Sequence, residues 1–238
     1  MFKSNLLPAI LCFLVLGISY GENSNPYYDP SKTHHTREGF TNPYLDDQKE
    51  NKSFGDLINM IMEDRPDEDE IKKKNVTVFT MDDLANAPQR FAVWGGHSTM
   101  LVVLEGKLIL TDPILSEYCS PVQFAGPKRY TPPAIDKDVL NMVDLVLISH
   151  NHYDHLDYNT VMLIGNHAQW IVPLGLKQWF KEQGIYEVKE YDWWDDDLVE
   201  GVKITCLPSQ HWSKRTVIKE FDTLWASWAV EHLSLIHI

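Results

Sequence analysis

The strongest constraint in this chain is a run of metal-binding side chains placed directly after a buried strand. Residues 149–157 read Ser-His-Asn-His-Tyr-Asp-His-Leu-Asp, and residues 144–148 read Asp-Leu-Val-Leu-Ile. A short apolar run rich in branched residues is typical of a buried strand. The cluster therefore lies where a buried strand ends and a loop begins, which is where α/β folds usually place their chemistry.

The spacing of these side chains predicts a metal site. His150 and His152 leave an extended backbone on the same side, so their imidazoles converge on one ion. Asp154 and His155 belong to the following turn and suit a second ion nearby. Nitrogen and oxygen ligands without thiolate favour catalytic zinc. A polar loop with unrelated histidines is the simpler alternative, but four ligands in the pattern His-x-His-x-Asp-His argue against it.

This motif resembles the signature of the metallo-β-lactamase superfamily, and several blocks around it resemble the branch of N-acyl-phosphatidylethanolamine-hydrolysing phospholipases D. The similar blocks are Thr-Asp-Pro at 111–113, Gly-Pro-Lys-Arg at 126–129, Val-Pro-Leu-Gly at 172–175, Asp-Trp-Trp at 192–194 and Pro-Ser-Gln-His-Trp at 208–212. The resemblance implies a mixed α/β (α+β) fold, the αββα sandwich of that superfamily, with its second half incomplete in this chain.

The resemblance also implies two zinc ions in the complete domain and assigns their ligands. His150, His152 and His211 would hold the first ion. Asp154 and His155 would hold the second ion and also act in catalysis. Two such ions, about 3.5–4 Å apart, would share a hydroxide and stabilise charge on a phosphoryl oxygen.

Four further residues receive supporting roles from the resemblance. His97 and Asp112 would hold the metal ligands from behind rather than bind an ion themselves. Gln123 and Phe124 would face the substrate from a long loop over residues 116–133, which is rich in Pro, Gly and aromatic residues. A plain surface loop explains the same composition equally well.

The implied reaction is hydrolysis of N-acyl-phosphatidylethanolamine to an N-acylethanolamine and phosphatidic acid. Another hydrolase of this fold, such as a lactonase or a smaller phosphodiesterase, is an alternative because the walls of the site set the substrate. A secreted, non-catalytic homologue is a third alternative. The expected partners are a phospholipid and a membrane surface, and a homodimer is compatible with the resemblance.

Net charge narrows the choice of partners. The formal charge of −13 argues against nucleic acid, because phosphate binding needs a basic surface. The same charge argues against simple electrostatic adhesion to an anionic membrane. Hydrophobic contact with lipid remains compatible with the composition.

The first residues predict entry into the secretory pathway. Residues 1–21 read as a signal peptide, with Lys3 before an apolar stretch and small residues near the end. An uncleaved anchor is the alternative, and the resemblance by itself implies association with intracellular membranes. Glycosylation sequons at Asn51 and Asn75 fit an extracellular location. Cys119 and Cys206 could pair in an oxidising compartment.

The chain divides into a polar N-terminal extension or linker over residues 22–75 and a metallo-β-lactamase domain over 76–232. A helix is expected over 54–62 in the extension. Within the domain we expect strands over 91–94, 202–207 and 224–230, a hairpin over 100–110, and helices over 158–166 and 175–183.

The C-terminus lacks two elements that the resemblance implies. No Gly-Asp-Thr block with a bridging Asp follows residue 230, and no later strand brings a last His. Residues 233–238, Leu-Ser-Leu-Ile-His-Ile, equal the translation of a sequencing-adapter end. We therefore expect a truncated and inactive chain with foreign residues from 233 onward. A natural short isoform is the alternative.

Overall fold

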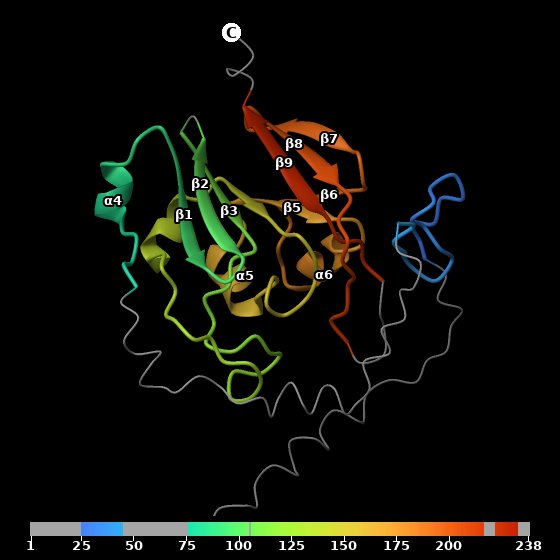
Figure 1. Cartoon of the computed structure of the whole chain (residues 1–238), viewed down its shortest axis with the longest axis horizontal. Coiled ribbons are helices and arrows are strands. Elements are labelled where there is room, and N and C mark those ends of the chain that lie inside the picture. Colours follow the sequence, from blue (N-terminus) through green and yellow to red (C-terminus); the bar gives the residue numbers. More distant parts are fainter. Residues whose placement is uncertain (1–24, 45–75, 105, 217–221, 233–238) are drawn as a thin grey trace, which may run out of the picture.

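The computed structural model describes residues 25–44, 76–104, 106–216 and 222–232. Within these residues the strands form two sheets (Figure 1). One sheet has six strands in the order β1-β2-β3-β4-β5-β6, and the other has three in the order β7-β8-β9. The mixed α/β fold predicted from the sequence is confirmed.

The strand order combines a meander with a parallel unit. Strands β1 to β3 pair antiparallel, whereas β3 to β6 pair parallel, and β7 to β9 pair antiparallel. The strands are β1 Arg90–Gly96, β2 Thr99–Leu104, β3 Lys107–Thr111, β4 Leu145–Leu147, β5 Gln169–Pro173, β6 Val188–Tyr191, β7 Asp196–Val199, β8 Val202–Leu207 and β9 Ser227–His232. The helices are α4 Met81–Ala85, the 3-10 helix η1 Lys137–Met142, α5 Tyr158–Ile164 and α6 Lys177–Glu182.

Strand β4 is buried on both faces, as its unbroken apolar sequence predicts. Because side chains alternate along a strand, Leu145 and Leu147 face one core and Val146 faces the other. Neighbouring strands repeat the pattern: Ile171 of β5 joins Leu147, and Trp170 joins Val146. The central sheet therefore separates two hydrophobic cores.

The first core lies between the six-stranded sheet and the helices. Val161 and Ile164 of α5 and Phe180 of α6 pack into it. The second core lies between the two sheets and includes Ile204 of β8 and the buried Trp225. The described layers are thus helices, a six-stranded sheet and a three-stranded sheet, and the described helices all pack on the outer face of the larger sheet (Figure 1).

The two main helices are shorter than the sequence predicts, and their ends explain why. Helix α5 begins after Asp157, whose side chain accepts from Asn159 N, and ends at Gly165 with φ 64°. Helix α6 lacks a side-chain cap at its own N-cap residue. Instead Glu190 Oε1 of β6 accepts from Lys177 N at 2.8 Å. A cap supplied from another strand leaves no local sequence signal.

Strand β9 begins three residues later than the predicted start at 224. Leu224, Trp225 and Ala226 are buried but run beside the other sheet: Ala226 N donates to Ser149 O at 2.9 Å. Trp228 Nε1 donates to Ile148 O at 3.0 Å. These bonds join the two sheets next to the His-rich motif.

Residues 25–44, which the sequence assigns to a polar extension, pack against the domain. We call them the N-terminal strap; it lies beside the turn after β6 in Figure 1. Phe40 of the strap is 3% exposed and belongs to the core between the sheets. The proposed signal peptide, both sequons, the helix expected over 54–62 and residues 233–238 lie outside the described residues. Among the described residues, none of the helices has the length and hydropathy to cross a membrane.

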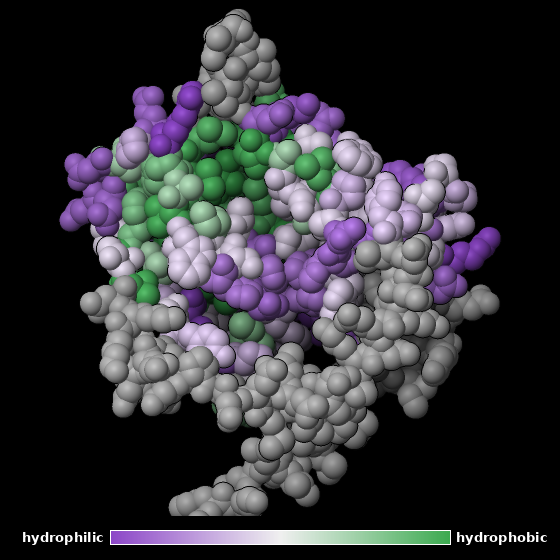
Figure 2. Space-filling model, viewed as in Figure 1, coloured by the Kyte–Doolittle hydropathy of each residue, from purple (hydrophilic) through white to green (hydrophobic). Residues whose placement is uncertain are grey.

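The core between the sheets reaches the surface on one side. Figure 2 shows an apolar area over β1 to β3 that extends toward β9. Val102 and Leu104 of β2 and Trp228 and Val230 of β9 are partly buried members of this core. In the described part of the chain the two sheets are therefore closed only incompletely along this seam.

Candidate metal centre

Strand order brings the candidate ligands to one edge of the central sheet. Strands β3 and β4 are adjacent and parallel, so their C-terminal ends meet at the same edge. Asp112 follows β3, and Ser149 and His150 follow β4. The backbone N–H of Asp112 donates to Leu147 O at 3.0 Å, with Asp112 at φ 38°. This left-handed conformation is costly for a non-glycine residue and fixes where the carboxylate points.

The structure brings His150, His152 and His211 together. His150 Nε2 lies 2.8 Å from His152 Nδ1 and 2.9 Å from His211 Nε2, and the third side of the triangle is 3.3 Å. Nitrogen ligands on a tetrahedral zinc ion, with bonds of about 2.0–2.1 Å, lie about 3.3 Å apart. The three nitrogens lie within about 0.5 Å of this spacing, so the group could hold one metal ion.

Burial favours the neutral, metal-binding form of the central imidazole. His150 is 3% exposed. Burial, together with the neighbouring rings of His155, His152 and His211, holds the pKa of His150 far below its usual value. A neutral imidazole has a lone pair to offer, as a metal ligand must.

A second group lies beside the first and is more exposed. His97 Nε2 is 3.0 Å from Asp154 Oδ2, and His155 Nε2 is 3.7 Å from the same oxygen. The rings of His150 and His155 have centroids 4.1 Å apart, so the two groups are neighbours. Asp154 and His155 were predicted for a second ion, and the structure adds His97 at ligand distance.

The charge on Asp154 follows from its neighbours. Burial raises the pKa of this carboxyl, but the hydrogen bond from His97 and the nearby His155 outweigh burial and hold the pKa well below its usual range. The same hydrogen bond raises the pKa of His97. Asp154 is thus ionised at neutral pH, as a metal ligand needs to be.

Behind these groups, Asp112 and Ser149 fix the orientation of two imidazoles. Asp112 Oδ2 accepts from Ser149 Oγ at 2.6 Å and faces His155 Nδ1 at 2.8 Å. Since the hydroxyl proton goes to the carboxylate, Ser149 Oγ accepts from His150 Nδ1 at 2.8 Å. Both rings then carry their protons on Nδ1, which leaves each Nε2 to face the metal groups. The supporting role expected of Asp112 has this geometry; Ser149 was not singled out from the sequence.

Arg215 binds the backbone of the loop that carries the motif. Its Nη1 donates to Asn151 O at 3.0 Å and to Leu156 O at 2.8 Å. The guanidinium stacks on Tyr153 and Trp179, with 4.4 and 4.8 Å to the ring centroids. Burial lowers the pKa of Arg215. The described hydrogen bonds of Arg215 are thus with the loop that carries the motif.

The loop over residues 116–133 contacts the His-rich motif at the first residue of the loop. Ser116 Oγ donates to Asp157 Oδ1 at 2.8 Å. Gln123 uses its amide within the loop, accepting from Tyr118 N and donating to Tyr118 O, and Phe124 is 73% exposed. The substrate role of Gln123 and Phe124 stays a prediction.

The two cysteines of the domain do not form a disulfide. Cys206 of β8 is buried between the sheets, Cys119 lies in the loop, and both are free thiols. The pairing that the sequence left open is therefore not formed.

Comparison with known proteins gives a consistent result. A family model described as a beta-lactamase superfamily domain matches residues 107–238. The chain is 42% identical over 164 residues to N-acyl-phosphatidylethanolamine-hydrolyzing phospholipase D 1 of Caenorhabditis elegans, covering 64% of this chain and 46% of that protein. It is 33% identical over 148 residues to the mitochondrial enzyme of that name from Saccharomyces cerevisiae, covering 60% and 31%. A metal-dependent hydrolase of Methanopyrus kandleri is 29% identical over 121 residues, covering 51% and 47%. The chain spans less than half of the length of each of these relatives.

Proposed function

This chain belongs to the β-lactamase superfamily of metal-dependent hydrolases, and on that basis we propose that it is a zinc-dependent phosphodiesterase acting on N-acyl-phosphatidylethanolamine. The proposed products are an N-acylethanolamine and phosphatidic acid. The observation that carries the proposal is the triangle of His150, His152 and His211 nitrogens. The similarity to two proteins named as phospholipases D of this type supports the choice of substrate.

The donor set supports zinc as the metal. Three imidazole nitrogens would hold one ion, and Asp154 with His155 would hold a second. Nitrogen and carboxylate ligands without thiolate are typical of catalytic zinc sites. When bound, zinc acts as a Lewis acid that stabilises negative charge on a phosphoryl oxygen.

The chain's own groups supply orientation. The Asp154 carboxylate, kept ionised by His97, can accept a hydrogen bond from an attacking water molecule and so orient it. Asp112 and Ser149 keep the Nδ1 protons of His155 and His150 away from the reacting centre. Arg215 fixes the backbone of the loop that carries these groups.

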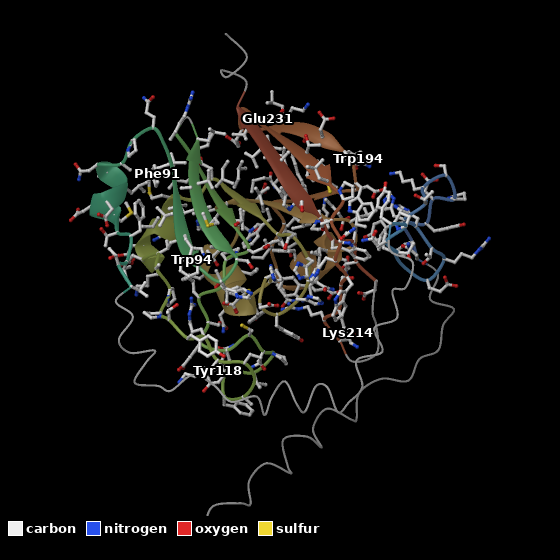
Figure 3. The ribbon with its side chains drawn as sticks, viewed as in Figure 1. Phe91, Trp94, Tyr118, Trp194, Lys214 and Glu231 are labelled. Carbon is white, nitrogen blue, oxygen red and sulfur yellow. The ribbon has the colours of Figure 1, made fainter. Side chains whose placement is uncertain are left out.

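A membrane surface is the proposed place of reaction. Phe124 and Tyr130, on the loop that begins at the motif, are 73% and 52% exposed. Figure 3 shows Tyr118 on this loop and Trp94, which is 59% exposed, at the end of β1 above it. Aromatic side chains favour the interface between lipid and water. With a net charge of −13, such contact would be hydrophobic rather than electrostatic.

The activity is tested with the full-length natural protein on vesicles that contain N-acyl-phosphatidylethanolamine. We expect phosphatidic acid and N-acylethanolamine, detected by mass spectrometry, and no product after chelation or in the His150→Ala variant. A lactone assayed in parallel separates the alternatives. Lactone hydrolysis without phospholipid cleavage would replace the proposed substrate, and zinc-free protein without either activity would support a non-catalytic homologue.

Membrane contact is tested by flotation with neutral phosphatidylcholine vesicles. The variants Phe124→Ser and Tyr130→Ser should lower the vesicle-bound fraction. Tyr186→Ser is the matched control, because Tyr186 is 65% exposed but follows α6, away from this loop. Equal binding by all three variants would refute the contribution of the loop.

A further inference from the structure

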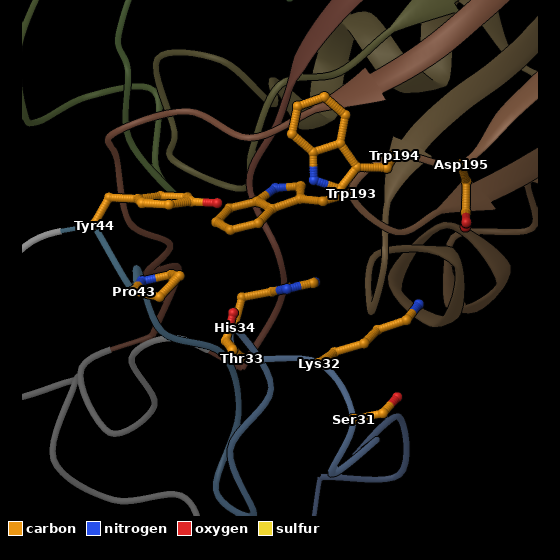
Figure 4. A pocket seen from close by; sticks show the side chains of 9 residues that line it. All are labelled: Ser31, Lys32, Thr33, His34, Pro43, Tyr44, Trp193, Trp194 and Asp195. Carbon is orange, nitrogen blue, oxygen red and sulfur yellow. The ribbon is translucent and has the colours of Figure 1, made fainter.

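The N-terminal strap is anchored to the domain by a buried cluster around Asp192. His34 Nε2 lies 2.7 Å from Oδ1 of this carboxylate, and His35 Nε2 lies 2.9 Å from Oδ2. His34, His35 and Asp192 are 7%, 7% and 4% exposed. The His34 ring stacks on Trp193, with centroids 4.4 Å apart, as Figure 4 shows. The strap is therefore held at a defined position beside the turn after β6.

The cluster has the composition of a metal site, but its charges indicate an anchor. Lys32 Nζ also forms an ion pair with Asp192 Oδ2. An ammonium on the same oxygen opposes a divalent cation there. Trp193 N donates to Oδ1 at 2.8 Å, so both carboxylate oxygens receive two donors. Hydrogen bonds and ion pairing thus account for the cluster without an ion.

At its other end, the strap contacts the loop that carries a metal ligand. Asn42, which is 2% exposed, donates from Nδ2 to Ser209 O at 3.2 Å, while its Oδ1 accepts from Tyr44 N. The same Ser209 carbonyl accepts from Trp225 Nε1 at 2.9 Å and from His211 N at 3.0 Å. Three donors from three parts of the chain therefore converge on one carbonyl, two residues before His211.

We propose that Asn42 is a positioning residue for the metal centre and that the Asp192 cluster seats the strap for this task. The loop that carries His150 and His152 is held by Arg215, which binds two of its backbone carbonyls. His211 comes from the other sheet, so its place in the triangle depends on the path of residues 208–213. The strap contributes one of the three hydrogen bonds that hold this path at Ser209. The inference rests on the proposed metal centre but not on the identity of the substrate.

The decisive variant is Asn42→Asp in the full-length natural protein. The carboxylate can still accept from Tyr44 N, but it has no proton to donate to Ser209 O and repels that carbonyl. We expect the affinity for Zn²⁺ at the three-histidine group to fall about tenfold, the lower end of the range for partners that contact a ligand directly, because Asn42 acts through the backbone of Ser209. Competition with a chromophoric chelator measures the affinity without an activity assay.

The matched control is Asn25→Asp in the same strap. Asn25 Nδ2 donates to Thr36 O and Gly39 O, and its Oδ1 accepts from Tyr27 N, so its described bonds stay within the strap. This variant should lower the melting temperature at least as much as Asn42→Asp but change zinc affinity less than threefold.

The outcomes separate the inference from the proposed function. Wild-type protein that binds no zinc would refute the metal centre itself. Wild-type protein that binds zinc, together with unchanged affinity in Asn42→Asp, would refute the positioning role. Equal losses of affinity in both variants would also refute it, because they would show a general effect of loosening the strap.

Discussion

Asp112 Oδ2 lies 2.8 Å from Nδ1 of His155, although the two residues are 43 positions apart in the sequence. The contact exists because β3 and β4 are parallel neighbours whose ends meet at one edge. Asp112, which lies outside the His-rich motif, therefore helps to set the orientation of His155 within it.

Asp112→Asn should therefore weaken metal binding without unfolding the protein. The carboxylate accepts with both oxygens, Oδ1 from Ser149 N and Oδ2 from Ser149 Oγ and His155 Nδ1. An amide has only one acceptor oxygen, so one of these two positions becomes a donor that faces a donor, and the hold on the imidazoles weakens. We expect zinc affinity to fall about 10–100-fold, measured by chelator competition. Asp144→Asn is the control, since Asp144 bonds to Lys107 and Leu108 N elsewhere. Full affinity in Asp112→Asn would contradict the assignment.

His211→Ala should remove one corner of the three-imidazole group. We expect loss of at least one zinc ion per chain, measured by elemental analysis after dialysis, and loss of hydrolysis with it. His167→Ala is the control, because His167 Nε2 bonds to Leu140 O in the helical layer. If His211→Ala kept its full metal complement, this residue would not be a ligand.

The free energy of unfolding should fall at acid pH because Asp192 becomes protonated there. Burial raises the pKa of Asp192, but hydrogen bonds from His34 and Lys32 outweigh it and hold that pKa below its usual value. The unfolded chain, with a carboxyl pKa of about 3.9, therefore takes up the proton first, so this stabilisation is present above about pH 4 and is lost as the pH falls further.

The comparison is between wild type and Asp192→Asn in urea unfolding at a series of pH values. At pH 7 the variant should be less stable by about 1–3 kcal/mol, because an amide cannot accept from all of the donors that meet at the buried carboxylate. Below about pH 4 the difference should shrink. A difference that stays constant down to pH 2 would show that Asp192 is not held ionised by its neighbours.

The leader and the sequons predict a glycosylated product in the medium of secretory host cells. Asn51→Gln and Asn75→Gln should each remove one glycan, seen as a step in electrophoretic mobility. Digestion with a glycosidase should bring wild type to the mobility of the double variant. Retention of unglycosylated protein in the cytosol, with residues 1–21 attached, would refute this prediction.

The sequence predicted best where the signal is local. An apolar run followed by His-x-His-x-Asp-His predicted a buried strand and a cluster of imidazoles directly after it, and the structure has both. His150 and His152 lie in the loop and turn after β4 rather than on extended strand, so strand geometry alone does not bring them together. Strands β2, β3 and β8 also appear within a residue of their predicted limits, because alternation and turn residues define them.

The contribution of residues distant in sequence could not be predicted in the same way. His211 was assigned by family resemblance, since nothing near it in the chain indicates that it faces His150. The role of Arg215 depends on two backbone carbonyls of another loop, and that of Asn42 on a carbonyl 167 positions away. Every residue has a backbone carbonyl, so the sequence does not indicate which carbonyl accepts such a hydrogen bond, and only the structure identifies it.

The strap shows how composition can mislead. Its polar sequence reads as a linker, yet two adjacent histidines and two asparagines are buried in it. The pair His34-His35 was a usable signal, because two neighbouring imidazoles in a polar segment need partners when they are ordered. The acidic partner, Asp192, stood in the Asp-Trp-Trp block of the family resemblance, but nothing in the sequence indicated that it contacts the strap.

The triangle of imidazoles draws on both sheets, with two corners after β4 and one after β8. An ion held there would act as a reversible cross-link between two halves of the molecule. Binding of zinc to the folded state alone would add to its stability in proportion to the logarithm of free zinc concentration. Zinc supply in the surroundings would then set how long the protein survives proteases, as well as how fast it works.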